Sequence, residues 1–84
     1  MTRLVDGHPL VQVETAPDGT PVRLRMDGET HGEVGICNRW RLDDDWWRTP
    51  VARAYYKLVT RDGLLCTVYL DEMTGTWHLE RIFD

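Results

Sequence analysis

The C-terminal part of the chain decides the fold: residues 51–83 read VARAYYKLVTRDGLLCTVYLDEMTGTWHLERIF. Polar and apolar residues alternate with period two in three runs of this segment, and β-branched and aromatic residues dominate the runs. Short connections containing Gly63 and Gly75 separate them, and glycine accepts the positive φ angles of tight turns. Because such short connections make neighbouring strands antiparallel, residues 51–83 are predicted to form a three-strand meander.

The same alternation continues outward from the meander toward the N-terminus, with turn signals at Pro17-Asp18-Gly19 and Asp27-Gly28. No stretch has the apolar spacing of an amphipathic helix. Gly32 and Gly35 predict a bulge or a sharp bend inside the third run. The expected fold class is therefore all-β: a small antiparallel, strongly curved sheet or partly open barrel of about six strands. The predicted strands are 10–15, 21–26, 32–42, 51–60, 64–71 and 76–83.

The alternation also predicts which side chains share a face. In the last run, Trp77, Leu79 and Phe83 are expected on the core face, together with Arg81. The core face predicted for 51–60 consists of Ala52, Ala54, Tyr56, Leu58 and Thr60. One face of 32–42 is predicted to carry Val34, Ile36, Asn38, Trp40 and Leu42, opposite Cys37, Arg39 and Arg41.

The chain has 84 residues, the size of one domain, and a formal net charge of −4. No apolar run approaches the roughly 18 residues of a membrane helix, and the N-terminus lacks the apolar core of a signal peptide. We therefore expect one domain, residues 1–84, located in the cytoplasm and without a membrane partner. Cys37 and Cys66 lie in apolar runs outside any C-x-x-C motif and are expected to be reduced thiols.

The charge is unevenly distributed, because residues 39–61 hold six basic and three acidic residues. The same part of the chain has the densest aromatic residues, and Trp, Tyr and Arg dominate the energetics of binding interfaces. If the runs 32–42 and 51–60 pair, their Arg, Tyr and Lys side chains are predicted to share one outer face. The candidate partner-binding residues are Arg39, Arg41, Trp46, Trp47, Arg48, Arg53, Tyr55 and Lys57.

Two structural interpretations compete with a binding site in this stretch. The Arg side chains can pair with Asp43, Asp44 and Asp45 on a solvated face, and surface ion pairs of this kind are common and weak. Trp46 and Trp47 can cap a small core that lacks apolar volume. If the stretch does bind, Arg residues interleaved with aromatic rings also suit single-stranded nucleic acid, where charges follow phosphates and rings stack on bases.

No motif for catalysis stands out, so no enzymatic activity and no cofactor are expected. The chain has no serine, no phosphate-binding glycine loop and no nucleophile elbow. Cys66 and His78 flank the last turn, yet Cys66 belongs to the predicted core face, where a thiol is a poor nucleophile. The His and Cys residues lack zinc spacing and Asp43–Asp45 lack the calcium-loop pattern, so no metal site is expected.

Residues 21–84 carry a pattern that combines Trp40-Arg41, Trp46-Trp47-Arg48, Arg53-Ala54-Tyr55-Tyr56 and, after a glycine turn, Trp77-His78-Leu79-Glu80-Arg81-Ile82-Phe83-Asp84. The pattern resembles a short bacterial domain of unknown function, found alone or appended to the C-terminus of inactive Y-family polymerase homologues of mutagenesis cassettes. The resemblance implies a DNA-repair neighbourhood and a role in contacting other repair proteins or DNA.

We therefore expect a non-enzymatic binding or protein-interaction module, linked to DNA repair or damage tolerance, whose partner is a protein. The alternative is a small domain that binds single-stranded nucleic acid through the basic aromatic stretch 39–57.

Overall fold

The computed structural model describes residues 2–4, 6–44 and 50–83, and these residues form strands and turns without a helix. All six predicted strands are present with closely similar bounds, except that β4 is longer. The first strand has no counterpart in the sequence prediction, because three residues are too few to show an alternation. The strands are β1 (Thr2–Leu4), β2 (Leu10–Thr15), β3 (Pro21–Met26), β4 (Glu29–Asp44), β5 (Val51–Thr60), β6 (Leu65–Asp71) and β7 (Thr76–Phe83).

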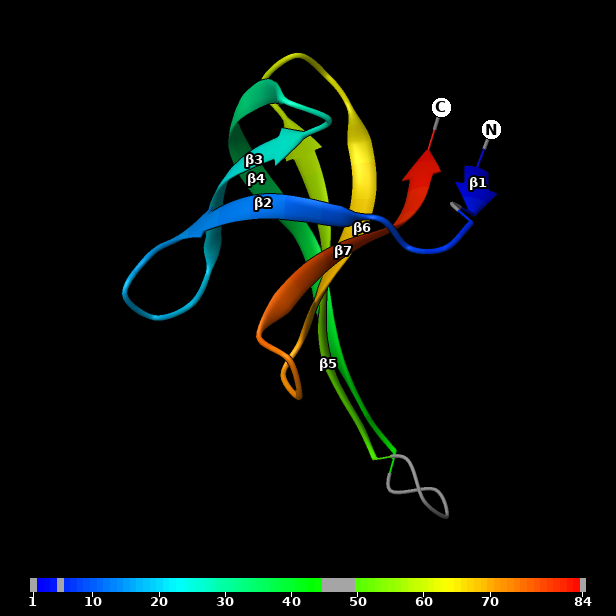
Figure 1. Ribbon diagram of the computed structural model, residues 1–84. Helices are drawn as coiled ribbons and strands as arrows, with labels where there is room; N and C mark the ends of the chain where they lie inside the picture. The colour runs from blue at the N-terminus through cyan, green and yellow to red at the C-terminus, as the bar shows by residue number, and fades with distance from the viewer. Residues whose placement is uncertain (1, 5, 45–49, 84) are drawn as a thin grey trace.

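Six of the strands close into an antiparallel barrel (Figure 1). Neighbours pair in the order β2–β3–β4–β5–β6–β7, and β7 returns to pair with β2. One edge of β7 is taken by β6, while β2 and β1 share the other edge, through Val11↔Trp77 and through residues 81–83. The all-β class and the C-terminal meander are confirmed, and the barrel is closed, so that each of its six strands has neighbours on both sides over part of its length.

Apolar side chains from β2, β3, β5, β6 and β7 fill the barrel. Leu58 and Cys66, both predicted on the core face, are fully buried, and Val68 lies beside them in the core. Tyr56 and Trp77 pack half-buried against this core, with their ring centroids 5.7 Å apart. The buried cluster consists of Val11, Leu24, Met26, Leu58, Cys66, Val68 and Leu79.

β4 is the longest strand, with 16 residues, and it changes partner along its length. Residues 29–33 pair with β3, whereas residues 34–44 pair with β5. The far ends of β4 and β5 extend beyond the barrel as a projecting hairpin, at the bottom of Figure 1. This hairpin carries most of the residues singled out in the sequence as a binding site.

The bulge predicted near Gly32 is present. Leu24 pairs with Gly32 and Arg25 with Thr30, so β4 has one extra residue at this point. Gly32 has a φ of 75°, a conformation that glycine adopts without steric cost. Gly35, in contrast, stays in regular register opposite Val59.

A second bulge in β4, which the sequence did not reveal, reverses the predicted facing of the hairpin. Ile36 pairs with Leu58 and Asn38 with Lys57, so Cys37 is the extra residue. Since facing residues of paired strands point to the same side, one extra residue moves every later side chain to the opposite face. The prediction that Trp40 shares a face with Ile36 is therefore wrong.

A bulge in β7 has the same effect on the last strand. Val68 pairs with Leu79 and Thr67 with Arg81, so Glu80 is the extra residue. Trp77 and Leu79 lie on the core side as predicted. Arg81 and Phe83, predicted on that same side, instead lie on the outer face, and Ile82 takes the core position.

Candidate partner-binding surface

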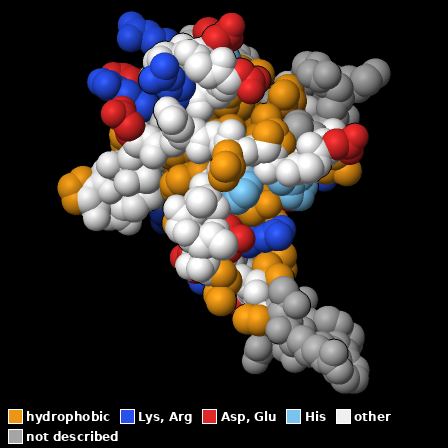
Figure 2. Space-filling model, in the orientation of Figure 1, with side chains coloured by type: hydrophobic (Ala, Val, Ile, Leu, Met, Phe, Trp, Pro, Cys, Tyr) orange, Lys and Arg blue, Asp and Glu red, His pale blue; other side chains and the backbone are white. Residues whose placement is uncertain are grey.

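Four aromatic side chains, one from each of β4, β5, β6 and β7, form a continuous row on the outer face of the sheet. The register pairs Trp40 with Tyr55, Tyr55 with Tyr69, and Tyr69 with His78. Their ring centroids follow one another at 5.4, 5.0 and 5.1 Å. We call these four residues the aromatic row. Figure 2 shows hydrophobic and histidine side chains gathered across the middle of the face in view.

Polar contacts hold the middle of the aromatic row in place. The Arg53 guanidinium lies 4.6 Å from the Tyr69 ring centroid and donates a hydrogen bond to the Tyr55 hydroxyl at 3.2 Å. His8 Nδ1 is hydrogen-bonded to the Tyr69 hydroxyl at 3.0 Å, and His78 Nδ1 donates to the His8 carbonyl at 2.9 Å. Through these two hydrogen bonds to His8, the segment before β2 is held against the aromatic row.

The two tyrosines are consequently buried although they point outward. Tyr55 is 5% exposed and Tyr69 is 3% exposed. Burial raises the pKa of the Tyr69 hydroxyl, and the hydrogen bond to Tyr55 raises the pKa of Arg53. The middle of the row thus acts as a small second core, and it is closed to a ligand.

The row is most exposed to solvent at its β4 end, since His78 at the β7 end is only partly exposed. Trp40 and Leu42, two residues apart on the same face, are each 42% exposed. The Trp40 indole stacks on Tyr55 with an interplanar angle of 7°. Arg53, opposite Leu42, and Lys57, opposite Asn38, flank these side chains. We call Trp40, Leu42, Arg53 and Lys57 the Trp40 patch.

The register divides the site residues predicted from the sequence into two sets. Arg53, Tyr55 and Lys57 lie together on the outer face, as predicted. Arg39 and Arg41, predicted on that face, lie on the opposite one, because they pair with Tyr56 and Ala54 beyond the Cys37 bulge. The remaining predicted residues, Trp46, Trp47 and Arg48, lie outside the described residues.

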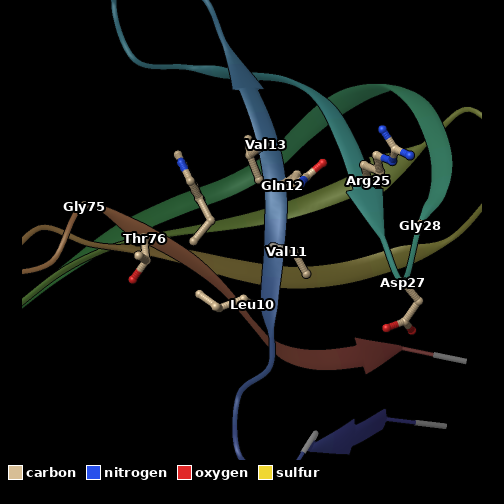
Figure 3. Close-up of a pocket in the computed structure, with 10 residues that line it drawn as sticks. Leu10, Val11, Gln12, Val13, Arg25, Asp27, Gly28, Gly75 and Thr76 are labelled. Carbon is tan, nitrogen blue, oxygen red and sulfur yellow. The ribbon is translucent and has the colours of Figure 1, made fainter.

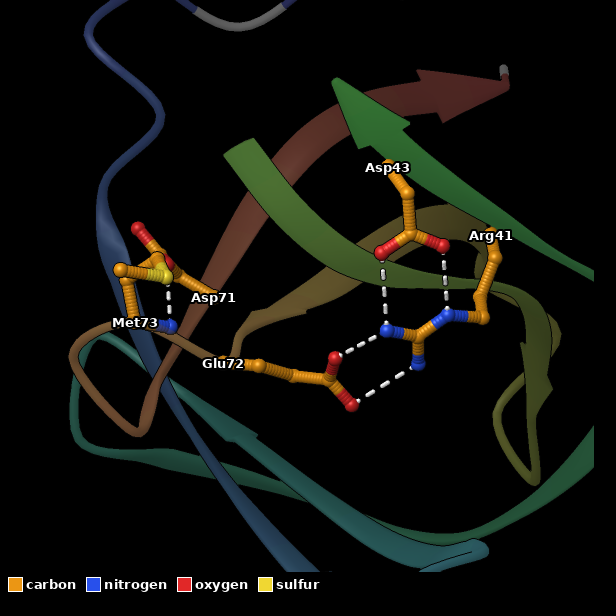
Figure 4. A network of polar contacts seen from close by, with 5 residues as sticks. All are labelled: Arg41, Asp43, Asp71, Glu72 and Met73. Carbon is orange, nitrogen blue, oxygen red and sulfur yellow. Dashed lines mark hydrogen bonds and ion pairs between the residues drawn. The ribbon is translucent and has the colours of Figure 1, made fainter. Parts of the chain in front are cut away.

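Arg41 is engaged in an ion-pair network on its face (Figure 4). Its guanidinium donates two hydrogen bonds to Asp43, at 2.9 and 3.0 Å, and two to Glu72 in the β6–β7 turn. These bonds lower the pKa of both carboxyl groups. The interpretation of the Arg residues as paired with neighbouring Asp residues is therefore confirmed for Arg41 and Asp43. The network also ties the projecting hairpin to the β6–β7 turn.

Sequence reasoning missed Trp40 as an exposed residue, and it named none of Tyr69, His78 and His8 as part of a binding surface. The row needs one aromatic residue on each of four strands, at positions that meet only after pairing. In the period-two pattern, Tyr69 is three residues from Cys66 and His78 is next to Trp77, so both lie away from the predicted core face. It carried no signal for the bulge that brings Trp40 beside them.

A separate surface hollow lies between β2, the β3–β4 turn and the β6–β7 turn (Figure 3). Its volume is about 720 Å³, and its lining includes Leu10, Gln12, Arg25, Asp27 and Thr76. Within residues 2–4, 6–44 and 50–83 no group of three His, Cys, Asp or Glu side chains is placed to hold a metal ion.

The two thiols differ in environment, and both are free. Cys37 is exposed at the bulge, whereas Cys66 is buried, and burial raises its pKa to about 11. Cys66 faces the core opposite Ile82, while His78 faces outward opposite Tyr69. The two residues therefore do not form a nucleophile–base pair.

Comparisons with known proteins returned no matching family model, no matching curated protein and no matching solved structure. Among the residues that the structure describes, no helix is long and apolar enough to cross a membrane.

Proposed function

We propose that this chain is a non-enzymatic protein-interaction module that binds its partner through the Trp40 patch. The observation that carries the proposal is the exposure of Trp40 and Leu42, 42% each, on the outer face of the projecting hairpin. Binding interfaces concentrate their energy in Trp, Tyr and Arg side chains that a partner covers completely. Stacking on Tyr55 holds the indole in one orientation, so little conformational entropy remains to be lost on binding.

The geometry favours a protein over single-stranded nucleic acid. A nucleic-acid site needs several rings open for base stacking along a basic groove. Of the aromatic row, Tyr55 and Tyr69 are buried, which leaves Trp40 as its well-exposed member. Arg39 and Arg41 lie on the other face, and two carboxylates already neutralise Arg41. In Figure 2 the basic side chains at the upper left lie among acidic ones.

The proposal includes a cytoplasmic location and a setting in DNA repair or damage tolerance. Both cysteines are free, in keeping with a reducing compartment. The repair setting rests on the resemblance of residues 21–84 described above, and it directs the search for a partner toward repair proteins.

The test identifies the partner by crosslinking in extracts of the source cells and then titrates the purified partner with three forms of the chain. The Trp40→Ala, Leu42→Ala double variant should bind at least about 30-fold more weakly than the parent chain, as expected for the loss of a central anchor. Met73→Ala is the matched control, because Met73 is an apolar side chain that is 59% exposed in the β6–β7 turn.

Equal binding by all three forms would overturn the assignment of the Trp40 patch. A parallel titration with a fluorescent single-stranded oligonucleotide at low salt separates the two functions. Binding there that weakens steeply with salt and is lost in the double variant would replace the protein partner by nucleic acid.

A further inference from the structure

Within the described part of the chain, the β4 strand has a long edge that no other strand pairs with. Its residues 34–44 pair with β5 on one side, and β3 pairs only with residues 29–33 on the other. Along residues 34–44, no strand within the described part of the chain occupies this second edge. An open edge of this length presents backbone N–H and C=O groups that are ready to pair with another strand.

Two backbone contacts show which residues point their polar groups to the open edge. The N–H of Arg39 donates to Oδ1 of the preceding Asn38 at 2.9 Å, so it does not point into the β5 ladder. The carbonyl of Ala52, opposite Asp43, accepts from the Glu72 N–H at 2.9 Å, on the β6 side of β5. Since backbone direction alternates along a strand, Arg39, Arg41 and Asp43 all present their N–H and C=O at the open edge.

The side chains along this edge are complementary to those of the same edge in a second, antiparallel copy of the chain. Reversing the order Arg39, Trp40, Arg41, Leu42, Asp43 about its centre places Arg39 opposite Asp43 and Trp40 opposite Leu42. Opposite charges and apolar pairs facing each other across neighbouring strands stabilise a sheet. The central residue then meets its own copy. Each Arg41 is already paired with Asp43 and Glu72 of its own chain, which reduces the repulsion at the centre.

We propose that two copies of this chain join through their β4 edges, antiparallel, around a two-fold axis at Arg41. A shift of one pair in either direction loses this match, because one shift places Arg39 opposite Arg41 and the other places Trp40 opposite Asp44. In the proposed register the edge groups of Arg39, Arg41 and Asp43 all find partners, and the Asn38 side chain moves aside to release the Arg39 N–H.

The pairing also joins the two Trp40 patches. Trp40 and Leu42 point to the outer face, and a two-fold axis perpendicular to the sheet keeps them on that face in both copies. The dimer thus presents one apolar strip, Trp40–Leu42 followed by Leu42–Trp40, to a partner. The edge contact itself uses no partner protein, so it stands or falls independently of the proposed function.

The test measures mass by sedimentation velocity over a range of concentrations, in a reducing buffer that keeps Cys37 from forming disulfides. Arg39→Glu places two carboxylates opposite each other across the interface, and Asp43→Arg places two guanidinium groups there. Each variant alone should therefore dimerise about tenfold more weakly or worse. In a one-to-one mixture of the two variants, the heterodimer has one glutamate–arginine pair and one Arg39–Asp43 pair, so the mixture should dimerise more tightly than either variant alone. Arg25→Glu is the control for net charge, since Arg25 lies on β3 away from this edge.

Thermal melting of each variant checks that the fold is retained. A parent chain that stays monomeric at millimolar concentration would overturn the proposal. So would a dimer that both single variants form as well as the parent, or a mixture that associates no better than its components.

Discussion

Trp40 lies flat on Tyr55, with ring centroids 5.4 Å apart and planes inclined by 7°. The stacking joins an exposed side chain to a buried one, so the two faces of the indole have different roles. One face contributes to the fold, and the other is open to solvent.

Trp40→Phe is therefore expected to retain more partner binding than Trp40→Ala, because a phenyl ring can still stack on Tyr55. Trp40→Ala should lower the free energy of unfolding by about 1 kcal/mol, because an aromatic pair typically contributes about that much stability. Urea unfolding and partner titration measure the two effects separately. A loss of stability above about 3 kcal/mol would assign Trp40 to the core instead.

Trp77→Ala tests the barrel interior. Trp77 packs against Tyr56 at the end of the core, and large-to-small substitutions of such residues cost about 3–5 kcal/mol. A domain of this size has about 5–15 kcal/mol in total, so the variant should melt far below the parent chain or fail to fold. Met73→Ala, at an exposed turn position, should melt with the parent. If both variants melt alike, the placement of Trp77 on the core side is wrong.

Tyr69→Phe tests whether the hydrogen bond between His8 and the Tyr69 hydroxyl holds the segment before β2 against the aromatic row. The substitution keeps the ring in the aromatic row and removes the hydroxyl that is bonded to His8 at 3.0 Å. We expect a cost of about 1 kcal/mol, together with faster hydrogen exchange around His8. Tyr56→Phe removes a hydroxyl from the opposite face of β5 and serves as the control. Unchanged exchange around His8 in the Tyr69 variant would contradict a fastening role.

The Arg41 network makes part of the stability depend on acid pH. Bonds from Arg41 lower the pKa of Asp43 and of Glu72 in the folded state. A carboxyl with a lowered folded-state pKa binds protons more readily when unfolded, so its contribution is complete above about pH 5 and is lost as the pH falls through the lowered pKa. Arg41→Gln should therefore lower the urea midpoint slightly at about pH 7 and leave it unchanged near about pH 2.

The pKa of Asp62 is also lowered, by Thr60 and His31, so the parent chain loses stability in acid through more than one carboxyl group. The difference in stability between the parent chain and Arg41→Gln isolates the contribution of the Arg41 network. All exposed pairs of this kind are screened by solvent, so the effect should shrink further at high salt. A difference between the two chains that is as large in acid as at neutral pH would show that Arg41 acts by packing alone.

The thiols should differ sharply in reactivity. Cys37 is exposed, whereas Cys66 is buried with a pKa raised to about 11, and the thiolate is the reactive form. Iodoacetamide at neutral pH should label Cys37 alone in the folded chain and both residues in urea, as read by mass spectrometry of peptides. Labelling of Cys66 under native conditions would mean that the β6 core face opens readily.

Local sequence determined where the strands lie and which side chains fill most of the core. Alternation over Ala54, Tyr56 and Leu58 identifies a buried face without reference to any other strand, because side chains on a pleated strand point alternately to its two sides. Gly63 and Gly75 mark the turns for an equally local reason, since each adopts a positive φ.

Only the tertiary structure decided the composition of the outer surface. Cys37 and Glu80 look like ordinary strand residues in the sequence, and they become bulges because β4 and β7 must stay in register with β5 and β6. Each bulge moves the following side chains to the other face, which brings Trp40 onto Tyr55 and turns Arg39 away from Lys57. A register is a property of two strands together, so the alternation within one strand cannot reveal where it shifts.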